Sequence, residues 1–449
     1  MTLGKHVWSL TPAKIILGGF LFIILTGALL LCLPIASRSG EFTPFIDALF
    51  TSTSATCVTG LIVHDTYTYW SAFGQAVILL LIQIGGMGVV TLAIAITIFS
   101  GKKIGLKQRF VMQESISAPQ VGGIIRMTRF ILKGTLFIEF FGAVLLSFQF
   151  IPQMGLPKGL WFSVFHSISA FCNAGFDLMG DTSGLCSSLT AYTGNVRINL
   201  PIMTLIIIGG IGFFVWDDIY AHRSRHKTYS LQTRIVLTTT FLLLLFPAVF
   251  FFFYEFSRDC WSGLSFPERF FAAVFQSVTP RTAGFNTVDL ALFSAPSQLM
   301  VILLMIIGGS PGSTAGGIKT TTFALSFLCV RSAFQNQESI QCYGRRIPYD
   351  ILRNAMTIVT MYITLLFTGA VLITSLEGTT LMEAVFETAS AIATVGLSLG
   401  ITGSLCGASK LILILLMYFG RVGGLTMLYA LTNHKKLPVM FPQERITVG

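Results

Sequence analysis

The chain has 449 residues, of which 53% are hydrophobic and only 11% are charged, and its mean hydropathy is +0.77. Soluble domains carry about 25% charged residues, so this composition excludes an ordinary soluble protein and places the chain in a membrane. The formal net charge of +10 does not indicate nucleic-acid binding, because the basic residues follow the loops between apolar segments.

Eight apolar segments are long enough to cross a bilayer, which takes about 20 residues. They lie at 15–34, 71–99, 127–151, 198–220, 235–256, 298–330 (interrupted), 351–375 and 410–431. Taken in order, the eight segments form four pairs, and a shorter apolar segment lies between the two members of each pair, at 44–55, 159–171, 268–279 and 381–392. These predict re-entrant helices, which are tolerated at membrane depth only where protein or a wet cavity covers their ends. The alternative is twelve ordinary spans.

One motif recurs at the end of each short segment. Its copies read FTSTSATCVTGL (Phe50–Leu61), FHSISAFCNAGF (Phe165–Phe176), FQSVTPRTAGF (Phe275–Phe285) and FETASAIATVGL (Phe386–Leu397). Each begins Phe-x-Ser/Thr-x-Ser/Thr and closes on Gly followed by Leu or Phe. Repeats at a fixed period set an architecture, so we expect four span–pore helix–span units, at residues 1–100, 101–222, 223–334 and 335–449.

Four such segments around one axis can form a ring of backbone carbonyls that replaces the water shell of a cation. Inward-facing carbonyls need unusual backbone angles, which glycine adopts without steric cost. The predicted filter consists of the closing glycines and the residues before them: Thr59, Gly60, Ala174, Gly175, Ala283, Gly284, Val395 and Gly396. We expect the upstream Ser/Thr pairs to hydrogen-bond to their own helix rather than to contact the ion.

A second glycine element follows each filter, and it reads IGGMG, IGGIG, IGGSPG and FGRVG. Close helix packing accounts for the first two. The third continues as GGSPGSTAGGIKTT (Gly308–Thr321), and no straight helix survives that run. We therefore expect the third unit alone to break its second span. The fourth copy carries Arg421, and an arginine inside a membrane is costly and by default functional or paired.

The glycine-rich break predicts a gate below the filter, because glycines and small polar residues rearrange at low cost. The predicted gate residues are Gly309, Ser310, Pro311, Gly312, Ser313, Thr314, Ala315, Gly316, Gly317, Lys319 and Arg421. The alternative is a structural kink, with Arg421 paired to lipid or to Asp217. A nucleotide-binding phosphate loop does not fit, because Ile318 separates Gly317 from Lys319.

Charge distribution predicts the orientation. The terminal segments and the 101–133, 222–234 and 331–353 loops carry 20 of the 29 Lys and Arg residues. Basic loops stay cytoplasmic, so both termini are expected inside and the filter segments outside. The outer side holds 12 of the 19 acidic residues, and a negative mouth concentrates cations.

These features together resemble the Trk/Ktr/HKT superfamily of potassium transporters. Four span–pore–span units, single filter glycines, the glycine-rich break in the third unit and the arginine in the fourth carry the resemblance. It covers essentially the whole chain, and four such segments in order are highly specific. The first unit begins within about 15 residues of Met1, as in the ion-translocating subunits of the bacterial Ktr branch.

The resemblance implies an all-α membrane protein of eight transmembrane and four re-entrant helices, with pseudo-fourfold symmetry around one pore. It implies K+ as the transported ion at the filter residues, Na+ as a possible activator, and no organic cofactor. Serine in place of the first filter glycine accompanies sodium preference in the HKT branch, and Gly60 therefore favours potassium. The implied partners are a second copy of the chain, a cytosolic ring of subunits that bind ATP or ADP, and the lipids of a bacterial cytoplasmic membrane.

Two rival classes fit less well. A coupled secondary cation transporter would predict inverted repeats and buried acidic residues, whereas these repeats run in one direction and Glu139 alone lies deep in a span. A membrane-embedded enzyme would need zinc-ligand spacing, a nucleophile elbow or paired acids within a span, and the sequence shows none of these. The eight cysteines are scattered without a CxxC pair, so the sequence predicts neither a disulfide framework nor a transition-metal site.

Overall fold

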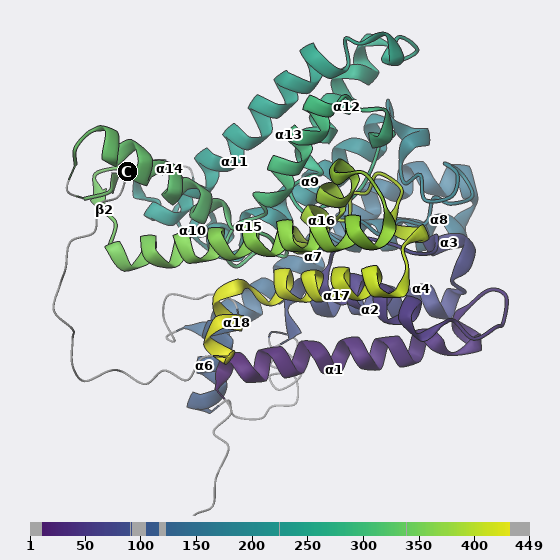
Figure 1. Ribbon diagram of the computed structural model, residues 1–449, viewed down its shortest axis with the longest axis horizontal. Coiled ribbons are helices and arrows are strands. Elements are labelled where there is room, and N and C mark those ends of the chain that lie inside the picture. The colour runs from purple at the N-terminus through teal and green to yellow at the C-terminus, as the bar shows by residue number, and fades with distance from the viewer. Residues whose placement is uncertain are drawn as a thin grey trace, which may run out of the picture.

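The computed structural model describes residues 11–89, 91, 105–115, 123–223, 225–337 and 339–431 (Figure 1). Helices dominate these residues. The strands described are β1 (Gln341–Cys342) and β2 (Arg345–Arg346), which pair as a short antiparallel hairpin. The basic segment at 102–104 and the tail from residue 432 onward lie outside the described residues.

Four sets of helices follow one another, and each set has a long first helix, a short helix and a second helix. The first set is α1 (Pro12–Cys32), α2 (Phe45–Cys57) and α4 (Ala72–Met87), and the second is α7 (Ile124–Met154), α8 (Leu156–Cys172), α9 (Val196–Ile211) and α10 (Phe213–His222). The third is α11 (Leu231–Phe250), the π-helical turn η4 (Phe251–Glu255), α12 (Phe266–Val278), α13 (Ala295–Ile306) and α14 (Thr320–Phe334). The fourth is α15 (Tyr349–Glu377), α16 (Leu381–Ala393), α17 (Gly407–Val422) and α18 (Gly424–Leu431).

Connecting segments add two further helices, α3 (Thr66–Tyr69) and α6 (Leu106–Ser115). They also contain single 3-10 turns, namely η1 (Pro34–Ala36), η2 (Thr190–Tyr192), η3 (His226–Thr228), η5 (Asp259–Trp261), η6 (Leu290–Leu292) and η7 (Thr402–Ser404).

The four sets close into a ring. Within each set the long helix packs on the short one, as α1 does on α2 and α15 on α16. Between sets, each second helix packs on the short helix of the next set: α4 on α8, α9 on α12, α13 on α16, and α17 back on α2 (Figure 1). The short helices therefore gather at the centre, and one phenylalanine within each of them is fully buried: Phe50, Phe165, Phe275 and Phe386.

Helix length and composition partly test the expected crossings. The first helices of all four sets, Pro12–Cys32, Ile124–Met154, Leu231–Glu255 and Tyr349–Glu377, are long and apolar enough to cross a membrane. The pair α9 and α10 passes the same test together but is bent by 93°. Helices α4, α13 and α14 are apolar but shorter. The number of eight crossings and the four unit boundaries therefore stay predictions.

The expectation that only the third set breaks its second helix is wrong. Helices α4, α9 and α17 also end at a glycine, and φ is +85° at Gly88, +96° at Gly212 and +91° at Gly423. Such angles end a helix, and glycine adopts them without a steric penalty. The third set differs in degree, because thirteen residues (307–319), here called the central loop, replace the single glycine between α13 and α14.

Close packing explains the glycines that precede these breaks, in the first two sets as the sequence indicated and in the fourth set as well. A Cβ on Gly85, Gly209 or Gly420 would come closer than 3.0 Å to a main-chain oxygen near the end of a short helix, namely that of Thr56, Phe171 or Ile392. Any side chain would therefore push the second helix away from the centre of the ring.

Candidate functional site

The four closing glycines lie in one closed ring. A Cβ built on each would come closer than 3.0 Å to the main-chain oxygen of the residue before the next one: Gly60 to Ala174, Gly175 to Ala283, Gly284 to Val395, and Gly396 back to Thr59. The extended segments of all four sets therefore meet around one axis. We call these eight residues the glycine ring.

Backbone geometry at the ring also requires glycine. The values of φ are +92° at Gly60, +70° at Gly175, +78° at Gly284 and +93° at Gly396. Side chains rarely tolerate this region. A side chain at any of the four glycines would therefore be strained by its backbone angle and would also collide with the carbonyl of the neighbouring set. That carbonyl would have to move.

Hydroxyl groups at the ends of the short helices hold these segments in place. Ser54 Oγ accepts a hydrogen bond from Gly60 N at 3.1 Å, and Ser390 Oγ accepts one from Gly396 N at 3.0 Å. In the other two sets the hydroxyl donates instead, from Ser169 to the oxygen of Phe176 and from Thr279 to that of Phe285, both at 2.6 Å.

The prediction for the Ser/Thr pairs is therefore only partly right. In the third and fourth sets the first hydroxyl of the pair donates to a main-chain oxygen of its own helix. Ser277 donates to Val274, and Thr388 donates to Ala384 at 2.8 Å. In the first two sets that hydroxyl reaches the long helix, from Ser52 to Ile24 at 2.7 Å and from Ser167 to Glu139 at 2.6 Å.

The ring leaves oxygens without protein donors. Within the described ranges, no N–H or O–H group donates to the main-chain oxygens of the eight ring residues, although Thr59 and Ala174 are fully buried. Buried carbonyls almost always have a partner. A desolvated cation is such a partner, and the C-terminal dipoles of α2, α8, α12 and α16 add partial negative charge nearby.

The central loop packs against the second set, next to the C-terminal end of its short helix α8. Its ends meet in an isolated bridge between Ile307 and Ile318. Thr314 Oγ1 donates to the oxygen of Phe171, in the last turn of α8, at 3.2 Å. Gly312 O accepts from Phe213 N at 2.7 Å. The loop thus caps the break between α9 and α10 and reaches the centre of the ring of helices.

Two basic side chains donate to main-chain oxygens of this loop, one from the fourth set and one from the loop itself. Arg421 donates to the main-chain oxygens of Thr314 and Gly85, and to that of Gly86 at 3.2 Å. Lys319 Nζ donates to the oxygen of Ala315 at 2.7 Å. Arg421 therefore links the fourth set to the loop of the third and to the helix break of the first. The partners it has are main-chain oxygens rather than Asp217.

A cavity of about 270 Å³ borders the loop. Gly312, Ser313 and Ala315 line it together with Lys319 and Arg421. The central loop therefore both contacts the end of a short helix and lines this cavity.

Sequence reasoning missed two features of the site. The first is that Arg421 donates to the main-chain oxygens of Gly85 and Gly86. These oxygens are free because α4 ends there, and the IGGMG motif was the sequence signal for that helix end. The second feature is a buried ion pair between Asp47, in the first turn of α2, and Lys410, in the first turn of α17, with a 2.7 Å contact. His64 contacts the other Asp47 oxygen at 3.2 Å. No sequence signal pairs residues so far apart.

No group of three or more His, Cys, Asp or Glu side chains that could hold a metal ion occurs in the described ranges. The eight cysteines are free thiols, and Cys57 and Cys172 are buried beside the glycine ring segments.

Comparison with known proteins gives a consistent result. Residues 20–441 match the family described as TrkH, cation transport protein. The chain is 40% identical to the potassium/sodium uptake protein NtpJ of Enterococcus hirae over 98% of both chains. It is also 40% identical to the Ktr system potassium uptake protein B of Bacillus subtilis, over 98% of this chain and 97% of that one. The solved structure of the potassium transporter TrkH from Vibrio parahaemolyticus shares the fold, with a TM-score of 0.73 and 21% identity over 96% of this chain and 87% of that chain.

Proposed function

The chain belongs to the TrkH family of cation transport proteins, and from that premise we propose that it takes up potassium through the glycine ring. It is a transporter and not an enzyme. The observation that carries the proposal is the closure of the ring: four positive-φ glycines, each against the carbonyl before the next, with no protein donor for those carbonyls in the described residues. Such oxygens can replace the hydration shell of a cation.

Potassium is the favoured ion because residue 60, the first ring position, is glycine, and the superfamily resemblance associates serine there with sodium preference. A less selective potassium and sodium uptake is the second candidate. Two observations support it. The Enterococcus hirae relative is named a potassium/sodium uptake protein, and the residues before the ring glycines differ among the four sets: Thr59, Ala174, Ala283 and Val395. Na+ would then act as a permeant ion or as an activator. Coupled secondary transport of the cation is the third possibility that the assay below separates.

The central loop is proposed as the gate. It contacts the end of α8 and lines the 270 Å³ cavity, and its main-chain oxygens accept hydrogen bonds from Arg421 and from its own Lys319. Its five glycines give its backbone wide conformational freedom, so a small displacement meets little steric resistance. Opening would break the contacts of Arg421 and of Thr314.

The proposed setting is a bacterial cytoplasmic membrane, with both termini and the basic loops inside. The proposed assembly is a homodimer on a cytosolic ring of nucleotide-binding subunits of the Ktr type. The name of the Bacillus subtilis relative, a protein of a Ktr system, supports a multi-component system. On this chain the exposed Arg345 and Arg346 of the hairpin lie on the proposed cytoplasmic side.

Flux measurements on the purified chain in liposomes test the function. An outward K+ gradient should drive rubidium uptake without a proton gradient, and external K+ should compete more strongly than Na+. Equal competition by Na+ would favour the less selective transporter. Uptake that requires a second ion gradient would favour coupled transport, and no cation flux at all would contradict the proposal.

A further inference from the structure

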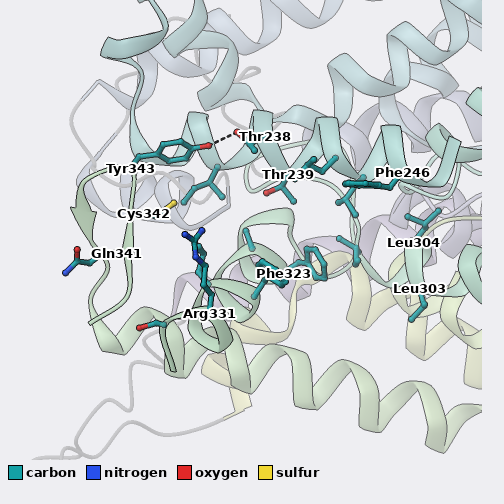
Figure 2. A pocket seen from close by; sticks show the side chains of 18 of the residues that line it. Thr238, Thr239, Phe246, Leu303, Leu304, Phe323, Arg331, Gln341, Cys342 and Tyr343 are labelled. Carbon is teal, nitrogen blue, oxygen red and sulfur yellow. Dashed lines mark hydrogen bonds between the residues drawn. The ribbon is translucent and has the colours of Figure 1, made fainter. Parts of the chain in front are cut away.

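A large groove outside the ring runs between α11, α13 and α14, and its volume is about 820 Å³ (Figure 2). Leu242 and Phe246 of α11 and Leu303 of α13 form apolar walls along it, and these side chains are exposed. Because α11 belongs to a segment long enough to cross a membrane, this part of the groove faces hydrocarbon.

One end of the groove is polar and cationic. Arg331 of α14 extends into it beside Cys342 and Tyr343 of the hairpin segment (Figure 2). Tyr343 Oη and Thr238 Oγ1 lie 2.8 Å apart and join the hairpin to α11. The guanidinium of Arg234 lies 5.8 Å from the centre of the Tyr343 ring. The opposite end, by contrast, is lined by Phe246, Leu303 and Leu304.

Arg331 is available to a ligand. Within the described ranges its exposed side chain makes no hydrogen bond or ion pair, and no acidic side chain lines the groove. Lipid tails fill an apolar groove whatever the lipid, so selectivity must come from the polar end. Arginine binds a lipid phosphate through two parallel hydrogen bonds. A zwitterionic headgroup also carries an ammonium, which Arg331 repels, so a basic pocket beside membrane helices selects anionic headgroups.

We propose that this groove binds one anionic phospholipid, with its phosphate on Arg331 and an acyl chain along the apolar wall towards Leu303. The proposed orientation places Arg331 in the cytoplasmic leaflet. Free phosphate in the cytosol is not the ligand, because it would leave the apolar length of the groove unused.

Binding would also affect the central loop. The groove walls α13 and α14 are the two helices that the loop connects, and Ile307, which lines the groove, forms the bridge with Ile318 at the base of the loop. A bound lipid fixes the spacing of these helices and favours one position of the loop. This second part rests on the proposed gate, whereas lipid binding itself does not.

Native mass spectrometry of the full chain tests binding. The protein is equilibrated with equal amounts of phosphatidylglycerol and phosphatidylethanolamine in detergent. We expect one retained phosphatidylglycerol, and we expect Arg331→Gln to lower its retention about tenfold, because a charge-assisted hydrogen bond is lost. Arg353→Gln is the matched control, since Arg353 lies on α15 beside Asp350 and outside the groove.

A second variant keeps the proposal falsifiable if Arg331→Gln folds poorly. Leu303→Trp fills the groove and should also lower lipid retention, whereas Leu372→Trp on α15 should not. Equal retention of both lipids, or retention unchanged in both groove variants, overturns the proposal. Variants that split a dimer without changing lipid retention would assign the groove to a second copy of the chain and overturn it as well.

Flux separates the two parts. Rubidium uptake by the unmodified chain should rise with the phosphatidylglycerol content of the liposome, and uptake by Arg331→Gln should not. Selective binding with flux that is insensitive to this lipid overturns the coupling to the loop and supports the site. Selective binding without any cation flux supports the site and contradicts the proposed function instead.

Discussion

The guanidinium of Arg421 donates a hydrogen bond to the main-chain oxygen of Thr314, in the middle of the central loop. An arginine inside a membrane is costly unless it is paired. Here its partners are carbonyls freed by two helix breaks, that of the loop and that of α4 at Gly85 and Gly86. The breaks and the cation therefore stabilise each other, and the loop cannot move away from Arg421 without giving up the Thr314 contact.

Replacing Arg421 with Ala should raise cation flux. Loss of a charge-assisted hydrogen bond to the loop costs about 1.5–3 kcal/mol, enough to raise the population of a displaced loop about tenfold or more. Rubidium efflux from liposomes without regulatory subunits measures the effect. Arg353→Ala is the control. Efflux at the unmodified rate from well-folded Arg421→Ala protein would contradict a gating role for this side chain.

Deleting residues 311–315 should raise flux further. The deletion removes Thr314, with its bonds to Arg421 and to the oxygen of Phe171, and Gly312, with its bond to Phe213. The same efflux assay applies, together with a size-exclusion profile to verify folding. If the shortened protein is folded and its flux does not change, the loop does not obstruct the pathway.

Removing the Ser54 hydroxyl, which accepts a hydrogen bond from the ring residue Gly60, should reduce both stability and selectivity. Ser54→Ala leaves the buried N–H of Gly60 without its acceptor, at a cost of about 1–3 kcal/mol. We expect a lower unfolding temperature and a lower ratio of potassium to sodium uptake. Ser375→Ala is the control, because that exposed hydroxyl bonds only to Val371 in its own helix. A normal uptake ratio in Ser54→Ala would show that this bond does not hold the ring geometry.

The buried pair of Asp47 and Lys410 should stabilise the junction between the fourth and first sets. Lys410→Met leaves a carboxylate without its cation, which typically costs about 3–5 kcal/mol. Thermal unfolding in detergent should show a large loss, and the double variant Asp47→Asn/Lys410→Met should recover part of it. A double variant as unstable as the single one would show that the ion pair is not the cause.

The sequence predicted the short helices well because each is an apolar segment with a recurring end. Helices α2, α8, α12 and α16 begin within three residues of the predicted segments. The glycine ring positions followed from the same repeats. That these segments are re-entrant and that eight helices cross the membrane are predictions that remain for experiment.

The breaks in α4, α9 and α17 could not be predicted because the glycines before them, a Gly-Gly pair in α4 and α9 and Gly420 alone in α17, suit both close packing and a helix end. Only the positive φ of the following glycine, such as Gly88 or Gly423, distinguishes them. Likewise, Asp47 and Lys410 are 363 residues apart, and only the closure of the four sets into a ring brings them together.

Selectivity of Gly60→Ser tests the central claim most directly. A serine there is strained at a φ of +92° and collides with the oxygen of Ala174, so it must move a ring carbonyl. The measurement is the ratio of rubidium to sodium tracer uptake in liposomes, with Gly407→Ser as the control at an unobstructed helix start. The account predicts a clearly lower ratio for Gly60→Ser and no change for Gly407→Ser. An unchanged ratio in folded, transporting Gly60→Ser protein would contradict the assignment of the glycine ring as the filter.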